Sequence, residues 1–142
     1  MKNIFLVVVL AFAFNAAGFA QCDKKVVLTS STTEYLDSNN VVERSVPENT
    51  TIKIDKSASL TIAPGKDHEM NGTITQNICN WKVPYKEGKS IIKATLTDKS
   101  GDVKTATITI EGKEKKITFL LEVAEMPGKK IRISVNTFQE EN

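Results

Sequence analysis

The chain has 142 residues, with 19 Lys and Arg side chains against 17 Asp and Glu side chains. This near balance excludes the strongly basic character that nucleic-acid binding requires. The scattered lysines fit a solvated surface better than an anionic partner. One histidine and two cysteines are too few for most catalytic or metal-binding arrangements.

Residues 1–20 are predicted to be a cleaved signal peptide. Lys2 gives a positive start, the run IFLVVVLAFAF is apolar but short for a membrane span, and small residues in NAAGFA lead to cleavage after Ala20. No second apolar segment of this kind follows, so we expect no stable membrane insertion. The mature chain, residues 21–142, is expected to be a single β-barrel domain in the periplasm or outside the cell.

Cys22 and Cys79 are candidates for a disulfide, which is the natural state of two cysteines in an oxidising compartment. The bond would close a long loop and stabilise the fold by about 4 kcal/mol. Two free thiols are one alternative, and a lipid on Cys22 is another. Gln21 is bulky where a lipoprotein needs a small residue, so lipid anchoring is less favoured.

After the leader, apolar and polar residues alternate with the period of a β-strand, and Gly or Pro falls between most of the runs. Two strands are expected near residues 25–36 and 41–46, where Ser and Thr weaken the pattern. Eight more strands then share one inward face, with short turns between them. Their apolar residues lie in 52–54, 60–62, 70–74, 79–83, 92–96, 106–110, 117–123 and 131–135.

Each hairpin has a predicted register that keeps the apolar residues on one side of the sheet. A tight turn at Gln76–Asn77 brings Gly72 opposite Trp81. The other registers place Ile54 opposite Leu60, Ile62 opposite Met70, Val83 opposite Ile92, Leu96 opposite Ala106, Ile110 opposite Ile117, and Val123 opposite Ile131.

The pattern predicts an all-β fold, an antiparallel up-and-down meander of eight to ten strands. Such a meander usually closes into a barrel, because closure removes the exposed edges. A two-sheet β-sandwich is the alternative, since hairpin registers do not show whether the first strand meets the last.

An exported meander with short turns such as KEGK, DKSGD and EGKEKK resembles the calycin group, the lipocalins and fatty-acid-binding proteins. It is also similar to small exported lipocalin-like proteins of bacteria. The resemblance covers most of residues 21–142. It implies a barrel that holds an apolar ligand, and it carries over no named ligand or binding residue.

A glycine within a strand leaves room for an indole on the facing strand, so Trp81 is expected to be a core anchor. The inward face supplies the candidate ligand-lining or core residues Met70, Trp81, Ala94, Ala106 and Phe119. The small side chains of Ala94 and Ala106 leave space that either a ligand or neighbouring residues would fill.

No catalytic, cofactor-binding or metal-binding residue is predicted. His68 stands between Asp67 and Glu69, but neighbouring residues on a strand point to opposite faces, so the three would not converge on a metal. His68 is expected to lie in a surface turn. Cys79 faces inward and is expected to be buried or bonded, not a nucleophile.

Two functions remain open. The first is a non-catalytic exported module that binds a small apolar molecule by burial, without a cofactor. The alternative is a structural or interaction protein with a filled core and no ligand. The pattern does not favour an enzyme, and it leaves the oligomeric state open.

Overall fold

The structure is a computed structural model that describes residues 20–65 and 68–141. A short 3-10 helix, η1 (Ala20–Asp23), precedes nine strands: β1 (Lys25–Asp37), β2 (Val42–Asp55), β3 (Ser59–Pro64), β4 (Met70–Val83), β5 (Glu87–Thr97), β6 (Val103–Lys113), β7 (Lys116–Val123), β8 (Lys129–Val135) and β9 (Thr137–Glu140). Apart from Ala20, the predicted signal peptide lies outside the described residues. Within those ranges, no helix has the length and apolar character to cross a membrane.

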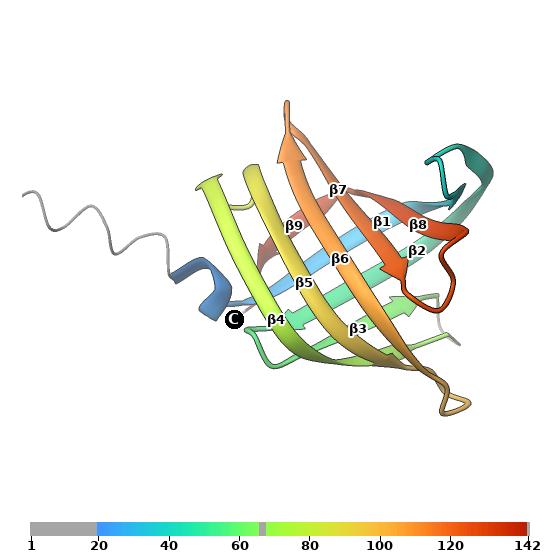
Figure 1. Ribbon diagram of the computed structural model, residues 1–142. Coiled ribbons are helices and arrows are strands. Elements are labelled where there is room, and N and C mark those ends of the chain that lie inside the picture. The colour runs from blue at the N-terminus through green and yellow to red at the C-terminus, as the bar shows by residue number, and fades with distance from the viewer. Residues whose placement is uncertain (1–19, 66–67, 142) are drawn as a thin grey trace, which may run out of the picture.

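The strands form a closed antiparallel barrel (Figure 1). Each strand from β1 to β8 pairs with the next, and β8 pairs with β1, so the sheet closes on itself. This confirms the predicted all-β meander and its closure into a barrel, and the two-sheet sandwich is wrong. β9 is an additional short strand that pairs with β1.

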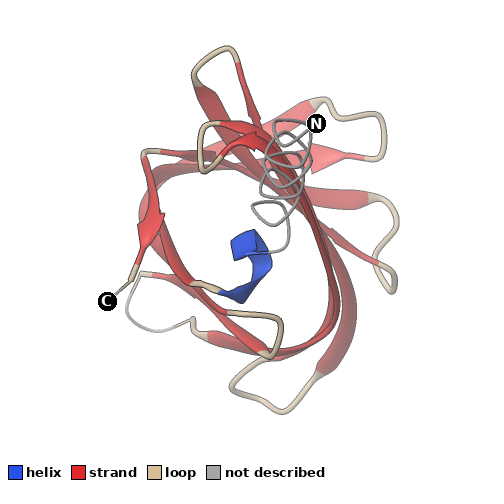
Figure 2. Ribbon diagram, turned by 90° about the vertical axis from the view of Figure 1, so that its left-hand side faces the viewer, coloured by secondary structure: helices blue, strands red, loops and turns tan. Residues whose placement is uncertain are grey.

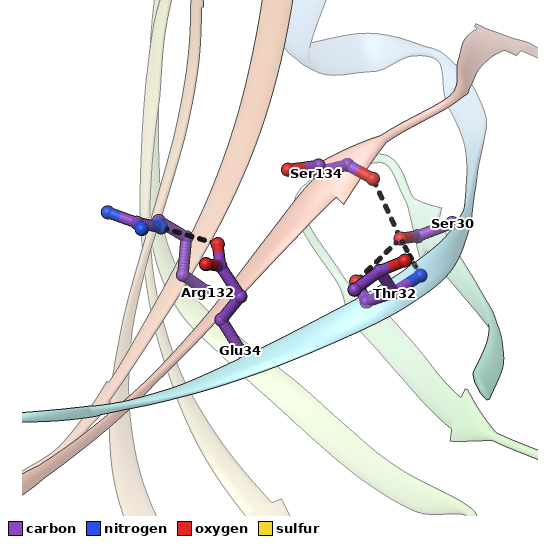
Figure 3. Close-up of polar contacts among 5 residues, drawn as sticks. All are labelled: Ser30, Thr32, Glu34, Arg132 and Ser134. Atoms are coloured by element: carbon purple, nitrogen blue, oxygen red, sulfur yellow. Dashed lines mark hydrogen bonds and ion pairs between the residues drawn. The ribbon is translucent and has the colours of Figure 1, made fainter. Parts of the chain in front are cut away.

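The seam of the barrel is the line along which β1 meets the end of the chain. One half of β1 pairs with β8 and the other half pairs with β9. Where the partner changes, the Ser30 hydroxyl donates to the Ser134 carbonyl (2.7 Å) and accepts from the Thr32 N–H (3.3 Å; Figure 3). Farther along, Arg132 Nε donates to Glu34 Oε1 at 3.0 Å. The Ser30 hydroxyl therefore bridges the seam where the strand ladder is interrupted, and the Arg132–Glu34 pair adds a side-chain contact within the β1–β8 ladder.

The predicted registers are confirmed around β3, where Ile54 faces Leu60 and Ile62 faces Met70. In the later hairpins the predicted registers are wrong by two residues: Ala94 faces Ala106, Gly112 faces Ile117, and Leu121 faces Ile131. A shift of two keeps each apolar side chain on the same face, so alternation alone does not detect it.

The turn between β6 and β7 shows what sets the register. Glu114 and Lys115 form a two-residue turn between Lys113 and Lys116, and both adopt the left-handed conformation, with φ of 53° and 65°. Asn and Gly are the residues that usually signal this turn. Because neither is present at these two positions, the sequence does not indicate where the chain reverses.

β4 is a single strand of 14 residues, and the predicted turn at Gln76–Asn77 is wrong. Its apolar residues change from even to odd positions, which either a turn or a bulge explains. The structure contains a bulge, since the register with β5 shifts between Ile74 and Gln76. After a second register shift, between Trp81 and Val83, Val83 faces Glu87 and not Ile92, and it is 40% exposed. The strands predicted at 41–46 and 52–54 are likewise one strand, β2.

The predicted pairing of Gly72 with Trp81 is also wrong. Gly72 faces Leu96, and a Cβ at Gly72 would lie 2.8 Å from Leu96 Cδ2. Trp81 instead faces Gly88, which in turn faces Gly112. A Cβ would lie 3.1 Å from the indole Cε3 at Gly88 and 3.0 Å from Cζ3 at Gly112. Glycine does make room for the indole, but two other glycines do so.

Buried aliphatic side chains fill the middle of the barrel around Phe119, which has 0% exposure. The cluster consists of Val26, Leu28, Ile52, Ile54, Leu60, Ile62, Ile74, Trp81, Ile92, Ala94, Leu96, Ala106, Ile108, Ile110, Phe119, Leu121 and Ile133. Its members come from all eight strands of the closed ring. Packing of this kind supplies most of the favourable free energy of folding.

One end of the barrel, the Trp81 end, is covered by η1. Figure 2 shows the helix lying across the ring of strands at this end. The predicted disulfide is confirmed: Cys22 in η1 is bonded to Cys79 in β4, with a Cα–Cα distance of 5.9 Å. The bond fixes η1 to the barrel wall.

Aromatic side chains fill the space beneath η1. Phe138 makes edge-to-face contacts with Trp81 and Tyr85, with centroid distances of 5.6 and 4.8 Å. The Tyr85 hydroxyl donates to Glu140 Oε1 at 2.8 Å. Partial burial, followed by the Glu140 carboxylate, raises the pKa of Tyr85 to about 12. These contacts hold β9 against the Trp81 end.

Candidate ligand site at the Tyr35 end of the barrel

The opposite end, the Tyr35 end, contains a cavity of about 550 Å³, which we call the vestibule. Strands β1, β2, β7 and β8 and the β7–β8 turn supply its walls. The lining residues are Tyr35, Leu36, Glu43, Arg44, Leu121, Val123, Met126, Lys129, Lys130 and Ile131. Leu121 also belongs to the packed core, so the core forms the floor of the vestibule.

A row of four cross-strand partners crosses the vestibule. Arg44 faces Tyr35, Tyr35 faces Ile131, and Ile131 faces Leu121. Because facing residues in a sheet point to the same side, the row leads from a guanidinium group across a phenol ring to two aliphatic side chains. The Arg44 guanidinium carbon lies 4.4 Å from the centroid of the Tyr35 ring, which is a cation–π contact.

The charged side chains of the vestibule differ in whether they are paired. Lys130 Nζ lies 3.7 Å from Glu122 Oε2, so its charge is largely compensated. In the part of the chain that the structure describes, Arg44, Lys129 and Glu43 make no ion pair. Arg44 and Lys129 are thus two lining cations outside any ion pair and Glu43 is one such carboxylate, while Asp37 is the cross-strand partner of Lys129 at the border of the vestibule.

Carboxylates fix the two turns that border the vestibule. Asp37 Oδ1 accepts from the backbone N–H of Asn39 and Val41 at 2.8 and 2.9 Å. Both Glu125 oxygens lie 3.0 Å from the Thr105 N–H, and this bond lowers the pKa of the Glu125 carboxyl. The walls are therefore held in place before any ligand binds, which reduces the ordering cost of binding.

The five candidate ligand-lining or core residues lie outside the vestibule. Trp81, Ala94, Ala106 and Phe119 are 8%, 2%, 1% and 0% exposed and belong to the packed core, and Met70 is half-buried against it. The cavity that reaches Trp81 holds about 20 Å³, which is space for roughly one water molecule.

Sequence reasoning missed Tyr35 and Arg44 because they lie in the two strands with the weakest alternation. The sequence does indicate that these two strands are neighbours, since a turn at DSNN would bring the predicted strands 25–36 and 41–46 together. Glu43 is an extra residue in β2, however, because the register shifts between Tyr35 and Leu36. The apolar pattern does not reveal this bulge, so it does not place Arg44 opposite Tyr35.

A second hollow, of about 670 Å³, lies between the β4–β5 and β6–β7 turns at the Trp81 end. Four of its six lining residues are exposed and charged, and only Val83 and Ile117 are apolar. None of the six is a buried member of the core. We therefore favour the vestibule, whose floor is continuous with the core.

Among residues 20–65 and 68–141, no three His, Cys, Asp or Glu side chains are placed to hold a metal ion. His68 is exposed, which confirms its predicted surface position, while Asp67 lies outside the described residues. The Cys79 sulfur is in the disulfide.

No family model, curated protein or solved structure matches the chain. The interpretation of the vestibule therefore depends on its own geometry and chemistry.

Proposed function

We propose that this protein is an exported, non-catalytic binding module of the lipocalin-like type that takes up a small apolar ligand in the vestibule. One observation carries the proposal: a cavity of about 550 Å³ combines an aliphatic floor with polar and charged groups at its rim. Small-molecule sites typically have about 300–1,000 Å³, with apolar walls that bury the ligand and polar groups that orient it.

The Cys22–Cys79 bond supports the exported location, since such bonds persist in oxidising compartments. It also argues against lipid anchoring, because the Cys22 sulfur is already bonded to Cys79. The binding module would then act in the periplasm or outside the cell.

The ligand would lie at the end of the barrel and not in its middle, where packed side chains occupy the space. Its inner side would rest on Leu121, Val123 and Ile131, and its outer side would remain near water. We therefore expect affinity to come from burial of one face, without a covalent step.

Titration with the neutral fluorophore N-phenyl-1-naphthylamine tests this proposal. Its emission should rise on binding, with a stoichiometry of one per chain. Val123→Trp should fill the vestibule and abolish the rise. The matched control, Ile117→Trp, changes another half-buried residue on the inward side of β7, at the Trp81 end. Loss of binding in Ile117→Trp alone would place the site at the Trp81 end and refute the proposed site in the vestibule.

The filled middle of the barrel favours a second candidate, a structural or interaction protein that holds no ligand. The same titration separates the two. The second candidate predicts no rise in emission with the unmodified protein, and no apolar compound in an organic extract of natively purified material. A stoichiometric compound in that extract would support the binding module.

A further inference from the structure

We infer that the Trp81 end is a thiol–disulfide exchange site in which the two cysteines have different roles. Cys22 takes up a sulfur from an external disulfide, and Cys79 is the internal thiolate that displaces it and closes the Cys22–Cys79 bond. Ligand binding in the vestibule plays no part in this inference. The roles follow from how the fold holds each cysteine and from the polar groups around the Cys79 sulfur.

The two cysteines differ in how firmly the fold holds them. Both are half-buried in the bonded form, so exposure does not distinguish them. Cys79 lies within β4, where it is the cross-strand partner of Ser90 and packs against the core. Cys22 lies in η1, outside the strand ladder that begins at Lys25 (Figure 2). Before the bond closes, Cys22 is therefore the cysteine that reaches an external partner, while Cys79 stays in the barrel wall.

A chain of hydrogen bonds ends on the Cys79 sulfur. The Trp81 Nε1–H donates to Ser90 Oγ at 2.7 Å, and the Ser90 hydroxyl donates to Cys79 Sγ at 3.5 Å. Ser90 is 5% exposed, so water does not compete freely for its proton. Once the bond is open, this donor favours the thiolate over the thiol, because a hydrogen bond to a charged acceptor is the stronger one.

Positive charge also surrounds the sulfurs. The cavity of about 20 Å³ that both cysteines line is bordered by the exposed Lys24 and Lys56. Among residues 20–65 and 68–141, no carboxylate lines this cavity. The carboxylates next to these lysines in the chain are exposed, as in Asp23, or lie near another cation, as in Asp55 at 4.0 Å from Lys25. A cysteine near lysines is more readily ionised, and the thiolate is the form that reacts.

Tyr85 is the other titratable side chain of the cavity lining. Its hydroxyl donates to Glu140, and its pKa is raised to about 12. Tyr85 therefore stays neutral over the pH range in which a thiol ionises, around pH 8.5.

The bond forms in two exchanges, with the external disulfide as the oxidant. The Cys22 thiolate attacks one sulfur of that disulfide, forms a mixed disulfide and releases one external thiolate. The Cys79 thiolate then attacks the Cys22 sulfur, the bond from Cys22 to the external sulfur breaks, and the second external thiolate leaves. The two protein thiols are oxidised to the disulfide, and the external disulfide is reduced to two thiols.

Glutathione disulfide tests the order of the two steps. Peptide mapping of the reduced protein, quenched early with acid, should find glutathione on Cys22. The single-thiol variants give a matched comparison: Cys79→Ala should react about tenfold faster than Cys22→Ala, because access limits a side chain that packs against the core. Equal rates, or glutathione found first on Cys79, would overturn the inference.

Ser90→Ala tests the hydrogen bond to the resolving sulfur. At about pH 7 the mixed disulfide on Cys22 should close about threefold more slowly, since fewer Cys79 thiols are ionised and the higher nucleophilicity of the more basic thiolate offsets only part of this loss. At about pH 10 the thiol is ionised without the donor, so the difference should disappear. The matched control is Ser30→Ala, which removes another hydroxyl with 5% exposure, at the seam, and should close at the unmodified rate.

Unchanged closure in Ser90→Ala would overturn the role of Ser90. Equal slowing at both pH values would also overturn it, because a displaced sulfur slows closure at any pH. Lys56→Gln, in an exposed turn, tests the charge even where Ser90→Ala fails to fold. Closure should slow at low salt, and the difference should vanish in about 0.5 M salt. Lys93→Gln, at an exposed position of β5, should not slow closure, and equal rates in the two lysine variants would overturn the role of Lys56.

Discussion

Removal of the Cys22–Cys79 bond should cost a large part of the protein's stability. The two cysteines are 57 residues apart, and the chain-entropy relation gives about 4 kcal/mol for a loop of this length. The perturbation is the double variant Cys22→Ala/Cys79→Ala. Reduced unmodified protein serves as the control, since it keeps both sulfur atoms and loses only the cross-link.

Urea unfolding, followed by Trp81 fluorescence, measures the effect. Trp81 lies two residues from Cys79 and belongs to the buried core, so its emission reports on loss of packing. The midpoint should fall in both the variant and the reduced protein. The slope of unfolding free energy against urea should rise, because an unfolded chain without the cross-link exposes more surface.

Agreement between the two perturbed forms would assign the loss to the cross-link. A loss below about 1 kcal/mol in both forms would refute the chain-entropy reasoning. A large loss in the variant alone would instead assign the stability to packing of the two side chains.

Four further outcomes are expected. Gly88→Ala should destabilise the fold by about 1–3 kcal/mol in urea melts, because the new Cβ would lie 2.5 Å from the Cα of Trp81. Trp81→Ala should lower the free energy of unfolding by about 3–5 kcal/mol. A loss below about 1 kcal/mol would contradict the place of Trp81 in the core. In a variant with Tyr85 as its only tyrosine, absorbance at 295 nm should titrate near pH 12, and Glu140→Gln should lower that midpoint. The raised pKa of Tyr85 adds stability that is complete below about pH 10 and lost between about pH 10 and 12; an unchanged midpoint in Glu140→Gln would refute the contact. Lys115→Gly should stabilise the protein by about 0.5 kcal/mol in thermal melts, since Lys115 has a φ of 65°; destabilisation would mean that the turn is not left-handed at this position.

Alternation in the sequence predicted the inward side chains along most strands, but it failed for Val83, which follows a register shift and is 40% exposed. Ile92, Ala94 and Leu96 were assigned to the inward face, and all three are buried. It was not sufficient for the register, because a shift of two residues leaves the faces unchanged. The turn at Glu114 and Lys115 sets one of these registers, and neither residue is of a type that signals a left-handed conformation.

The bulges limited the prediction of the site more strongly. A bulge between Ile74 and Gln76 reverses the side-chain parity within β4, and the sequence shows only the parity change, which a turn explains equally well. The extra residue at Glu43 similarly determines that Arg44 faces Tyr35. Both bulges lie between consecutive strands, where the apolar pattern does not reveal an extra residue. Closure of the barrel then places Ile131 of β8 opposite Tyr35, a pairing that no hairpin register predicts.

The seam has a consequence for the order in which the chain acquires its structure. β1 begins at Lys25, yet its free edge is completed only by β8 and β9, which end at Glu140. Closure therefore waits until almost the whole chain has been synthesised and, for an exported protein, has left the translocation channel. Pairings between such distant segments slow folding, typically to milliseconds or seconds. During this interval an open sheet edge would be exposed to aggregation, so we expect chaperones to matter most before β9 docks.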